Sequence, residues 1–281
     1  MGTSQSSGGP GQGVPMVPPW TPNLPPDAPP QANPPVNPPG ANPPLVPPPV
    51  PPAPVPNAPP GRFGGARRSL GEFSRSGSRG DLQRGLGHYV RSGYGGTRTA
   101  SRRFGGTIST AQALGGALAG MADPAIVPGS PLDPALLAGR TADEVMDAIV
   151  EAVRPVDGTQ DAEAERASIR DSLSELLTQF PNADLLNLTP EERNFVIERF
   201  TANDVCHRFE LDVGQAIIEN APNATMALGR IKEIRAYIKE SVSAAFRNLR
   251  NAGRNLTTHN IAQVVRDALY ETFEVFEGYA A

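Results

Sequence analysis

Apolar side chains recur at steps of three and four residues along most of the chain between residues 107 and 281. This spacing collects them on one face of an α-helix, which can then pack against its neighbours. The most regular run consists of Ala227, Ile231, Ile234, Ile238, Val242, Ala245 and Leu249. No stretch alternates apolar and polar residues long enough to predict a β-strand. We therefore expect a mainly α fold, in which residues 107–281 form an α-helical domain, a bundle of about five or six helices.

Local signals predict where several of these helices begin and end. The segment Thr141-Ala142-Asp143-Glu144 is a capping box, and Thr189-Pro190-Glu191-Glu192 repeats it with proline at the first helical position. Pro181 ends an apolar helical pattern that precedes the second box. The pattern from Pro190 to Asn220 fits one long helix or two, and Asn220-Ala221-Pro222-Asn223 then breaks the chain.

The first 60 residues have a different composition. They hold 24 of the chain's 32 prolines and a single charged side chain, Asp27. Proline fixes φ and restricts the residue before it, so repeated Asn-Pro-Pro and Val-Pro units favour polyproline II over a packed core. We expect residues 1–60 to be a disordered tail, with a Gly/Ser tip followed by a semi-stiff proline-rich stalk.

Charge separates the rest of the chain into two parts. Residues 61–106 contain ten arginines and two acidic residues, a net charge of +8. Residues 107–281 contain 15 basic and 26 acidic residues, a net charge of −11. The thirteen glycines of the basic segment argue against a continuous helix there. The chain thus divides into a tail, a basic segment rich in glycine, arginine and aromatic residues, and an acidic body.

The basic segment has two interpretations. Arginine can pair with phosphate and aromatic rings can stack on bases, so the chain could be a nucleic-acid-binding adaptor. Alternatively, the segment packs on an acidic surface of its own body or of a partner, with Phe63, Phe73, Tyr89, Tyr94 and Phe104 as anchors. We favour this docking interpretation because the aromatics are regularly placed. The candidate residues for binding a partner or nucleic acid are Arg67, Arg68, Tyr89, Arg91, Tyr94, Arg102, Arg103 and Phe104.

Signals of catalysis are weak. The three histidines are scattered, and no nucleotide-binding, nucleophile-elbow or metalloprotease motif is present. Cys206 and His207 are neighbours, but adjacent helical residues point about 100° apart, so they make a poor catalytic pair. We expect Cys206 to be a packed small hydrophobe and the chain not to be an enzyme. Four acidic residues are predicted to form a solvated or partner-facing surface: Asp204, Glu210, Asp212 and Glu219.

The single cysteine excludes an internal disulfide and any multi-cysteine metal site. No metal ligand set is expected. No apolar run approaches the length of a membrane span, and the first residues lack the basic and apolar regions of a signal peptide. We therefore expect a cytoplasmic protein without a membrane partner.

The amino terminus is a candidate site of modification. No lysine precedes Lys232, and the small residue Gly2 would become the terminal residue once Met1 is removed. An α-amine has a reference pKa of about 8, against about 10.4 for lysine, so a larger fraction of it is nucleophilic at neutral pH. Gly2 is therefore a candidate acceptor for acylation. The start also fits the loose N-myristoylation pattern, but no basic cluster lies near it to supply the second membrane signal.

The order of short motifs resembles the QatB family, the B component of the bacterial Qat anti-phage defence system. The motifs are Met1-Gly2-Thr3-Ser4, Val17-Pro18-Pro19-Trp20, Arg67-Arg68-Ser69-Leu70-Gly71, Gly87-His88-Tyr89-Val90-Arg91, Gly93-Tyr94-Gly95-Gly96 and Arg102-Arg103-Phe104-Gly105-Gly106. The likeness spans roughly residues 1–120 and extends only loosely into the helical body. It implies three partners: an ATPase, an enzyme similar to the QueC deazaguanine synthases, and a TatD-like nuclease.

The resemblance also implies a chemical role for the tail. A QueC-like enzyme activates a carboxy-deazaguanine and passes it to an amine. Carried onto this sequence, the acceptor is Gly2, with Thr3, Ser4 and Trp20 as recognition residues. The chain would then be a scaffold and a substrate, with no cofactor other than a covalent deazaguanine adduct at Gly2.

Overall fold

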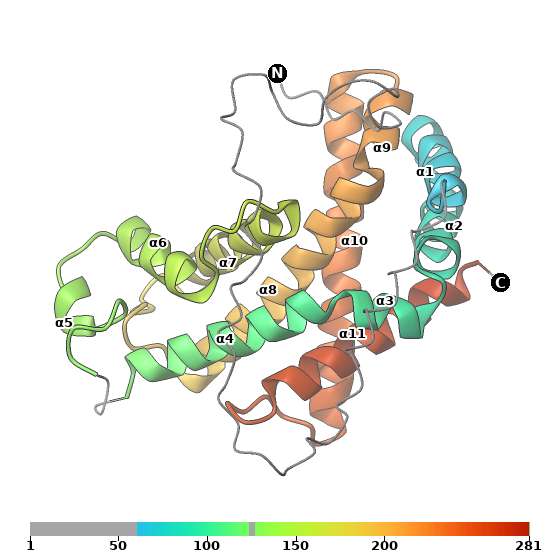
Figure 1. Cartoon of the computed structure of the whole chain (residues 1–281). Coiled ribbons are helices and arrows are strands. Elements are labelled where there is room, and N and C mark those ends of the chain that lie inside the picture. Colours follow the sequence, from blue (N-terminus) through green and yellow to red (C-terminus); the bar gives the residue numbers. More distant parts are fainter. Residues whose placement is uncertain (1–60, 124–126, 281) are drawn as a thin grey trace, which may run out of the picture. The chain divides into compact units, whose positions relative to one another are not determined.

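The computed structural model describes residues 61–123 and 127–280, and the predicted disordered tail lies outside this part of the chain. The described residues form helices joined by turns, and no strand occurs among them, which confirms the mainly α fold (Figure 1). They belong to one compact unit.

The basic segment folds into short helices rather than a continuous one. Its elements are α1 (Gly64–Ser76), α2 (Arg79–His88), the π-helical η1 (Tyr89–Tyr94) and α3 (Thr97–Arg103). The helix α1 ends at Gly77, whose φ of 72° is in the left-handed region that favours glycine. Gly95 and Gly96, with φ of 80° and 97°, separate η1 from α3. Glycine therefore breaks the helix here, as the composition indicates.

The C-terminal part contains more helices than the pattern predicts. They are α4 (Gly105–Met121), α5 (Pro134–Leu137), α6 (Ala142–Val153), α7 (Gln160–Gln179), α8 (Pro190–Phe209), η2 (Glu210–Gly214), α9 (Gln215–Asn220), α10 (Ala224–Asn251) and α11 (Ile261–Gly278). The expected five or six is too low, partly because α4 is rich in small residues and lacks a distinct apolar stripe. Both predicted capping boxes form, at Thr141 and Thr189. From Pro190 to Asn220 the chain is one helical run with a π-helical insertion.

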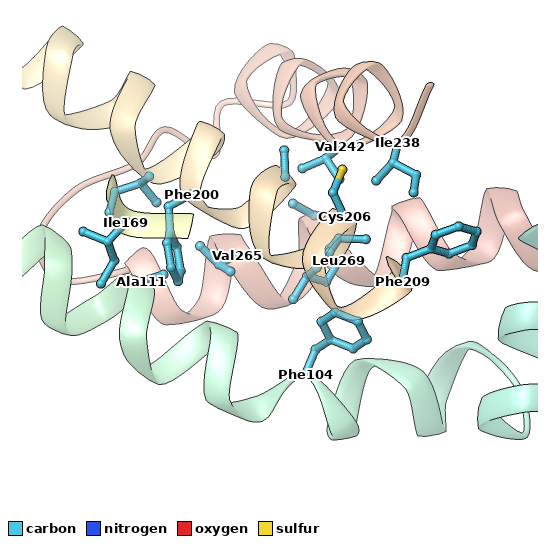
Figure 2. Close-up of a cluster of buried hydrophobic side chains, with 14 of the residues drawn as sticks. Phe104, Ala111, Ile169, Phe200, Cys206, Phe209, Ile238, Val242, Val265 and Leu269 are labelled. Atoms are coloured by element: carbon cyan, nitrogen blue, oxygen red, sulfur yellow. The ribbon is translucent and has the colours of Figure 1, made fainter. Parts of the chain in front are cut away.

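The core is organised around α8. This helix contacts α4, α7 and α10, and α11 packs against both α4 and α10 (Figure 1). Figure 2 shows Phe200, Cys206 and Phe209 of α8 surrounded by apolar side chains of these helices. The same buried cluster extends from Phe63 to Phe276, so residues 61–106 and the helices after them share one hydrophobic core.

No helix in the described ranges is both long and apolar enough to cross a membrane.

Candidate functional site

The aromatic residues of the basic segment anchor it to the protein's own C-terminal helices. Phe63 stacks on Tyr89 with ring centroids 5.4 Å apart, and Tyr89 meets Phe209 of α8 edge to face at 4.9 Å. Phe104 lies 4.9 Å from Phe273 of α11. In Figure 2 its side chain points toward the cluster around Leu269 and Phe209. Of the two docking surfaces that the sequence leaves open, these aromatics contact the chain's own C-terminal helices, and they do so through its apolar core rather than through an acidic surface.

This packing corrects part of the candidate binding set. Tyr89 and Phe104 are 1% and 0% exposed, so neither can stack on a base or contact a partner. Tyr94 is half-buried and donates its hydroxyl to Asp212 at 2.8 Å. The regular spacing of Tyr89, Tyr94 and Phe104 places their rings against the helices of the body. Buried aromatic rings and their pairs contribute strongly to the stability of a core.

Asp212 of η2, the element that follows α8, lies where the basic segment packs on the body. Its carboxylate accepts hydrogen bonds from Tyr89 at 3.1 Å and from Tyr94 at 2.8 Å, and Arg62 lies 4.0 Å away. Arg67 donates to the backbone carbonyl of Asp212 at 2.9 Å. Burial raises the pKa of this carboxyl, although the tyrosine hydrogen bonds act in the opposite direction. Asp212 is therefore a docking point for the segment and not part of a solvated acidic face.

A second polar junction lies deeper, around Arg208. Its guanidinium pairs with Asp204 at 3.0 Å, with Glu165 at 2.8 Å and with Asp161 at 3.2 Å. Asp204 is completely buried and Glu165 is 2% exposed. Burial raises the pKa of Asp204, while the charge of Arg208 lowers it. Thr107 of α4 donates its hydroxyl to Asp204 at 2.5 Å, so the network joins α4, α7 and α8.

The predicted acidic surface is thus wrong as a single face. Asp204 and Asp212 are held by internal partners, as described above. Glu210 forms a two-point ion pair with Arg235 of α10, one of whose contacts is 2.6 Å. Glu219 accepts a hydrogen bond from Gln215 at 2.9 Å. Spacing along one helix accounts for Arg208 beside Asp204 and for Gln215 beside Glu219, which are four residues apart. It could not reveal the partners of Glu210 and Asp212, which come from other elements.

A Ser–His–Asp arrangement that the sequence did not reveal lies between α7 and α8. The Oγ of Ser168 is 2.9 Å from Nδ1 of His207, and Nε2 of His207 is 3.4 Å from Asp171. Ser168 is completely buried, and its hydroxyl also lies 2.7 Å from the carbonyl of Ala164 four residues earlier. A substrate cannot reach a hydroxyl in this position. We interpret the arrangement as a helix-to-helix contact, since the attacking atom of a hydrolase must be accessible.

The pair of His207 and Asp171 makes stability depend on pH. The hydrogen bond that His207 donates to Asp171 raises the pKa of His207 and lowers the pKa of Asp171. The stability that His207 contributes is fully present below the histidine pKa of the unfolded chain, about 6.5. It is lost as pH rises through the raised pKa of the folded state. The stability that Asp171 contributes is present above the aspartate pKa of the unfolded chain, about 3.9. It is lost as pH falls through the lowered pKa of the folded state.

Asp171→Asn should therefore destabilise the protein more at pH 5.5 than at pH 8.5. We expect the free energy of unfolding to fall by about 0.5–1 kcal/mol at the lower pH. The loss is modest because the aspartate is half exposed and solvent screens the pair. Urea unfolding at both pH values measures the difference. Asp147→Asn is a matched control, since Asp147 pairs with Arg170 and not with a histidine. Equal losses at both pH values for Asp171→Asn would contradict the assignment.

Cys206 is the packed small hydrophobe that the sequence predicts. It is 2% exposed, and burial raises the pKa of its thiol to about 12 (Figure 2). The thiolate needed for nucleophilic or metal chemistry is therefore disfavoured. Within residues 61–123 and 127–280, no group of three or more His, Cys, Asp or Glu residues has the geometry of a metal site.

The remaining candidate residues are exposed arginines. Arg67 and Arg91 are exposed but donate to backbone carbonyls, the latter to Ala280 at 2.8 Å. Arg68, Arg102 and Arg103 are exposed and have no ion-pair partner among the residues that the structure describes. These three can contact a partner, and their role in doing so stays a prediction. Gly2, Thr3, Ser4 and Trp20 lie outside the described residues, so their roles also stay predictions.

The neighbours Arg102 and Arg103 serve different surfaces. Arg102 lines a pocket of about 380 Å³ together with Arg98 and Arg266. Arg103 lines a separate pocket of about 270 Å³ together with Arg62. The separation follows from the helical geometry of α3, in which consecutive side chains point about 100° apart.

Comparison with known proteins identifies the family. The family model described as "Qat anti-phage system associated protein QatB" matches residues 95–276. The chain belongs to the QatB family. The match runs from just before α3 to almost the end of α11. It therefore covers the helical body, into which the resemblance carried by the N-terminal motifs extends only loosely. No curated protein and no solved structure matches the chain.

Membership in the QatB family makes this protein a component of an anti-phage defence system. QatB is described as a protein associated with the Qat system, so other Qat components are its partners. The family is not one of known enzymes.

Proposed function

We propose that this QatB-family protein acts as a non-enzymatic scaffold of the Qat complex and as the substrate of a QueC-like partner, with the α-amine of Gly2 as the acceptor. The partner would activate the carboxyl group of a carboxy-deazaguanine with ATP. The amine would then attack the activated carbonyl carbon, displace the ATP-derived phosphate leaving group and lose a proton, which leaves an amide. The observation that carries the proposal is the absence of lysine before Lys232, which leaves the terminal amine as the one aliphatic amine of the tail.

The buried state of the reactive side chains supports a non-enzymatic role. The thiol of Cys206 and the hydroxyl of Ser168 are both enclosed by helices, and burial raises the pKa of the thiol. Covalent catalysis by either group would need a nucleophile that a substrate can reach. The proposal therefore assigns the chemistry to the partner and the presentation of the amine to this chain.

The exposed arginines support docking. The body around them is acidic, with a net charge of −11 over residues 107–281. Arg68, Arg102 and Arg103 are exposed without an internal partner in the described part of the chain, so they are available to carboxylates of another protein. In this proposal the ATPase and the QueC-like enzyme bind the folded body, the tail delivers Gly2 to the catalytic pocket, and the TatD-like nuclease is a further component. Docking is favoured over nucleic-acid binding because Tyr89 and Phe104 cannot stack on bases.

Intact-mass measurement tests the modification. Co-expression with the QueC-like partner and its precursor should add one deazaguanine acyl group to the chain that lacks Met1, and fragmentation should map it to Gly2. Gly2→Pro should abolish the adduct, because a secondary ring amine presents a different nucleophile to the pocket. Gly8→Pro, a substitution in the same tip that leaves the amine unchanged, should retain it.

The two lysines provide the second control. A chain carrying Lys232→Arg and Lys239→Arg should be modified as fully as the unsubstituted chain. An adduct that survives Gly2→Pro but disappears in the lysine double variant would overturn the assignment. An unchanged mass with active partner and precursor present would overturn the proposed modification altogether.

A further inference from the structure

The pocket lined by Arg98, Arg102 and Arg266 has the character of an anion site. Arg98 and Arg102 are four residues apart and so lie on the same face of α3. Arg266 comes from α11, more than 160 residues later in the chain, and all three side chains are exposed. The fold therefore brings three positive charges to the wall of one pocket.

Most arginines of residues 107–281 are engaged by carboxylates, whereas among those of residues 61–106 only Arg62 and Arg84 form ion pairs with described residues. Arg154, Arg166, Arg170, Arg208, Arg235, Arg247 and Arg254 each pair with at least one carboxylate. Arg98, Arg102 and Arg266 have no such pair among the described residues, although the surrounding body is strongly acidic. Like charges that share a site repel one another, and an anion bound between them relieves this repulsion.

The acidic residue in the lining does not neutralise the pocket. Asp267 is part of the wall, but its carboxylate is paired with Arg254, which is not a lining residue. The lining arginines thus retain an excess of positive charge. Since guanidinium groups bind phosphate through paired hydrogen bonds, a phosphate group is the anion that this set suits best.

Besides the charged residues, Ser101 and Gly105, the wall contains one aromatic and one aliphatic side chain. Tyr270 follows Arg266 by one helical turn on α11 and is 42% exposed, and Ile108 of α4 also lines the pocket. An exposed aromatic ring beside arginines offers a face on which a base can stack. The volume of about 380 Å³ is at the small end of ligand pockets, which suits one nucleotide rather than a dinucleotide.

We propose that this pocket binds a nucleoside monophosphate, or the corresponding part of a larger nucleotide. Arg98, Arg102 and Arg266 hold the phosphate, and Tyr270 stacks on the base. This inference does not depend on the modification of Gly2, because it concerns the folded body alone.

Binding to the full-length chain without partners tests the proposal. The probes are AMP, GMP, adenosine and inorganic phosphate. Isothermal titration calorimetry at low salt measures the affinity of each. AMP or GMP should bind more tightly than phosphate or adenosine, because only the nucleotides engage both parts of the site. Arg102→Ala and Arg266→Ala should each weaken nucleotide binding by about 10-fold or more, since each removes a charge-assisted hydrogen bond.

Two further variants separate the parts of the site. Tyr270→Ala should weaken binding of AMP or GMP by about 5-fold or more but leave inorganic phosphate unchanged. Gly105→Leu should block the pocket while keeping every charge, because a Cβ at this lining glycine meets no atom within 4 Å and so projects into open space. Arg68→Ala is the matched control, since Arg68 is exposed and outside the lining.

Three results would overturn the proposal. The first is the absence of AMP and GMP binding at about 1 mM, a concentration that detects even weak sites. The second is an equal loss of affinity in Arg68→Ala and Arg102→Ala, which would indicate a diffuse basic surface. The third is unchanged nucleotide affinity in Gly105→Leu, with the variant shown to be folded by its circular dichroism.

Discussion

Arg208→Met is expected to lower the free energy of unfolding by about 3–5 kcal/mol, because it leaves buried carboxylates without their counter-charge. Asp204 and Glu165 are 0% and 2% exposed and both pair with this guanidinium. Arg154 also contacts Glu165 at 2.7 Å, but Asp204 would retain only the hydroxyl of Thr107. Urea unfolding followed by circular dichroism at pH 7.5 measures the loss.

The loss should shrink at acidic pH. Burial already raises the pKa of Asp204, and removal of Arg208 raises it further because the charged form loses its main stabilising partner. A carboxyl whose pKa is raised in the folded state stabilises the protein below the pKa that it has in the unfolded chain. This stabilisation is lost as pH rises through the pKa of the folded state. Arg208→Met should therefore be less destabilised at pH 4.5 than at pH 7.5.

A surface arginine provides the comparison. Arg247 pairs with Glu240, and their side chains are 48% and 71% exposed. Arg247→Met should cost no more than about 1 kcal/mol, as is usual for exposed ion pairs. If Arg208→Met cost as little, the buried network would not be what holds α4, α7 and α8 together.

Phe104→Ala is expected to destabilise the protein by about 3–5 kcal/mol. Its ring is fully buried between Tyr94 and Phe273, and the guanidinium of Arg208 lies 5.3 Å from its centroid. The substitution thus removes a large apolar group at the point where the basic segment meets α11. Denaturant unfolding measures the loss, and Leu211→Ala, at a site that is 53% exposed, should change stability by no more than about 0.5 kcal/mol.

The shape of the Phe104→Ala unfolding curve is also informative. Because residues 61–106 share the core with α8 and α11, the variant should still unfold in one transition, at a lower denaturant concentration. A separate early transition confined to residues 61–106 would instead show that the basic segment is an independently folding unit.

The burial of its aromatic residues changes how the composition of the basic segment is interpreted. Its arginine, glycine and aromatic residues have the composition of a nucleic-acid-binding region, yet Tyr89 and Phe104 serve the core. The exposed groups that remain are arginines. They divide into those held by backbone carbonyls, such as Arg67 and Arg91, and those free to bind another molecule, such as Arg102.

Sequence reasoning was most successful where structure depends on near neighbours. The sequence predicts the capping boxes at Thr141 and Thr189, the break after Asn220 and the glycine interruptions of the basic segment, and the structure contains all of them. A cap or a break is decided by residues within one turn, so its signal is present in the sequence itself. The helix α4 was missed because its small residues give no distinct apolar stripe.

The sequence by itself determined the helical class, the separation of charge and the identity of Cys206 as a buried residue, since these follow from composition and local spacing. Only the tertiary structure decided which charges meet. It placed Glu165 of α7 on the guanidinium that Arg208 also offers to Asp204, set Asp171 against His207, and brought Arg266 beside Arg98 and Arg102. Glu165 and Arg208, Asp171 and His207, and Arg266 and Arg102 lie on different helices. The packing of those helices depends on the shape of the whole core, which no local pattern encodes.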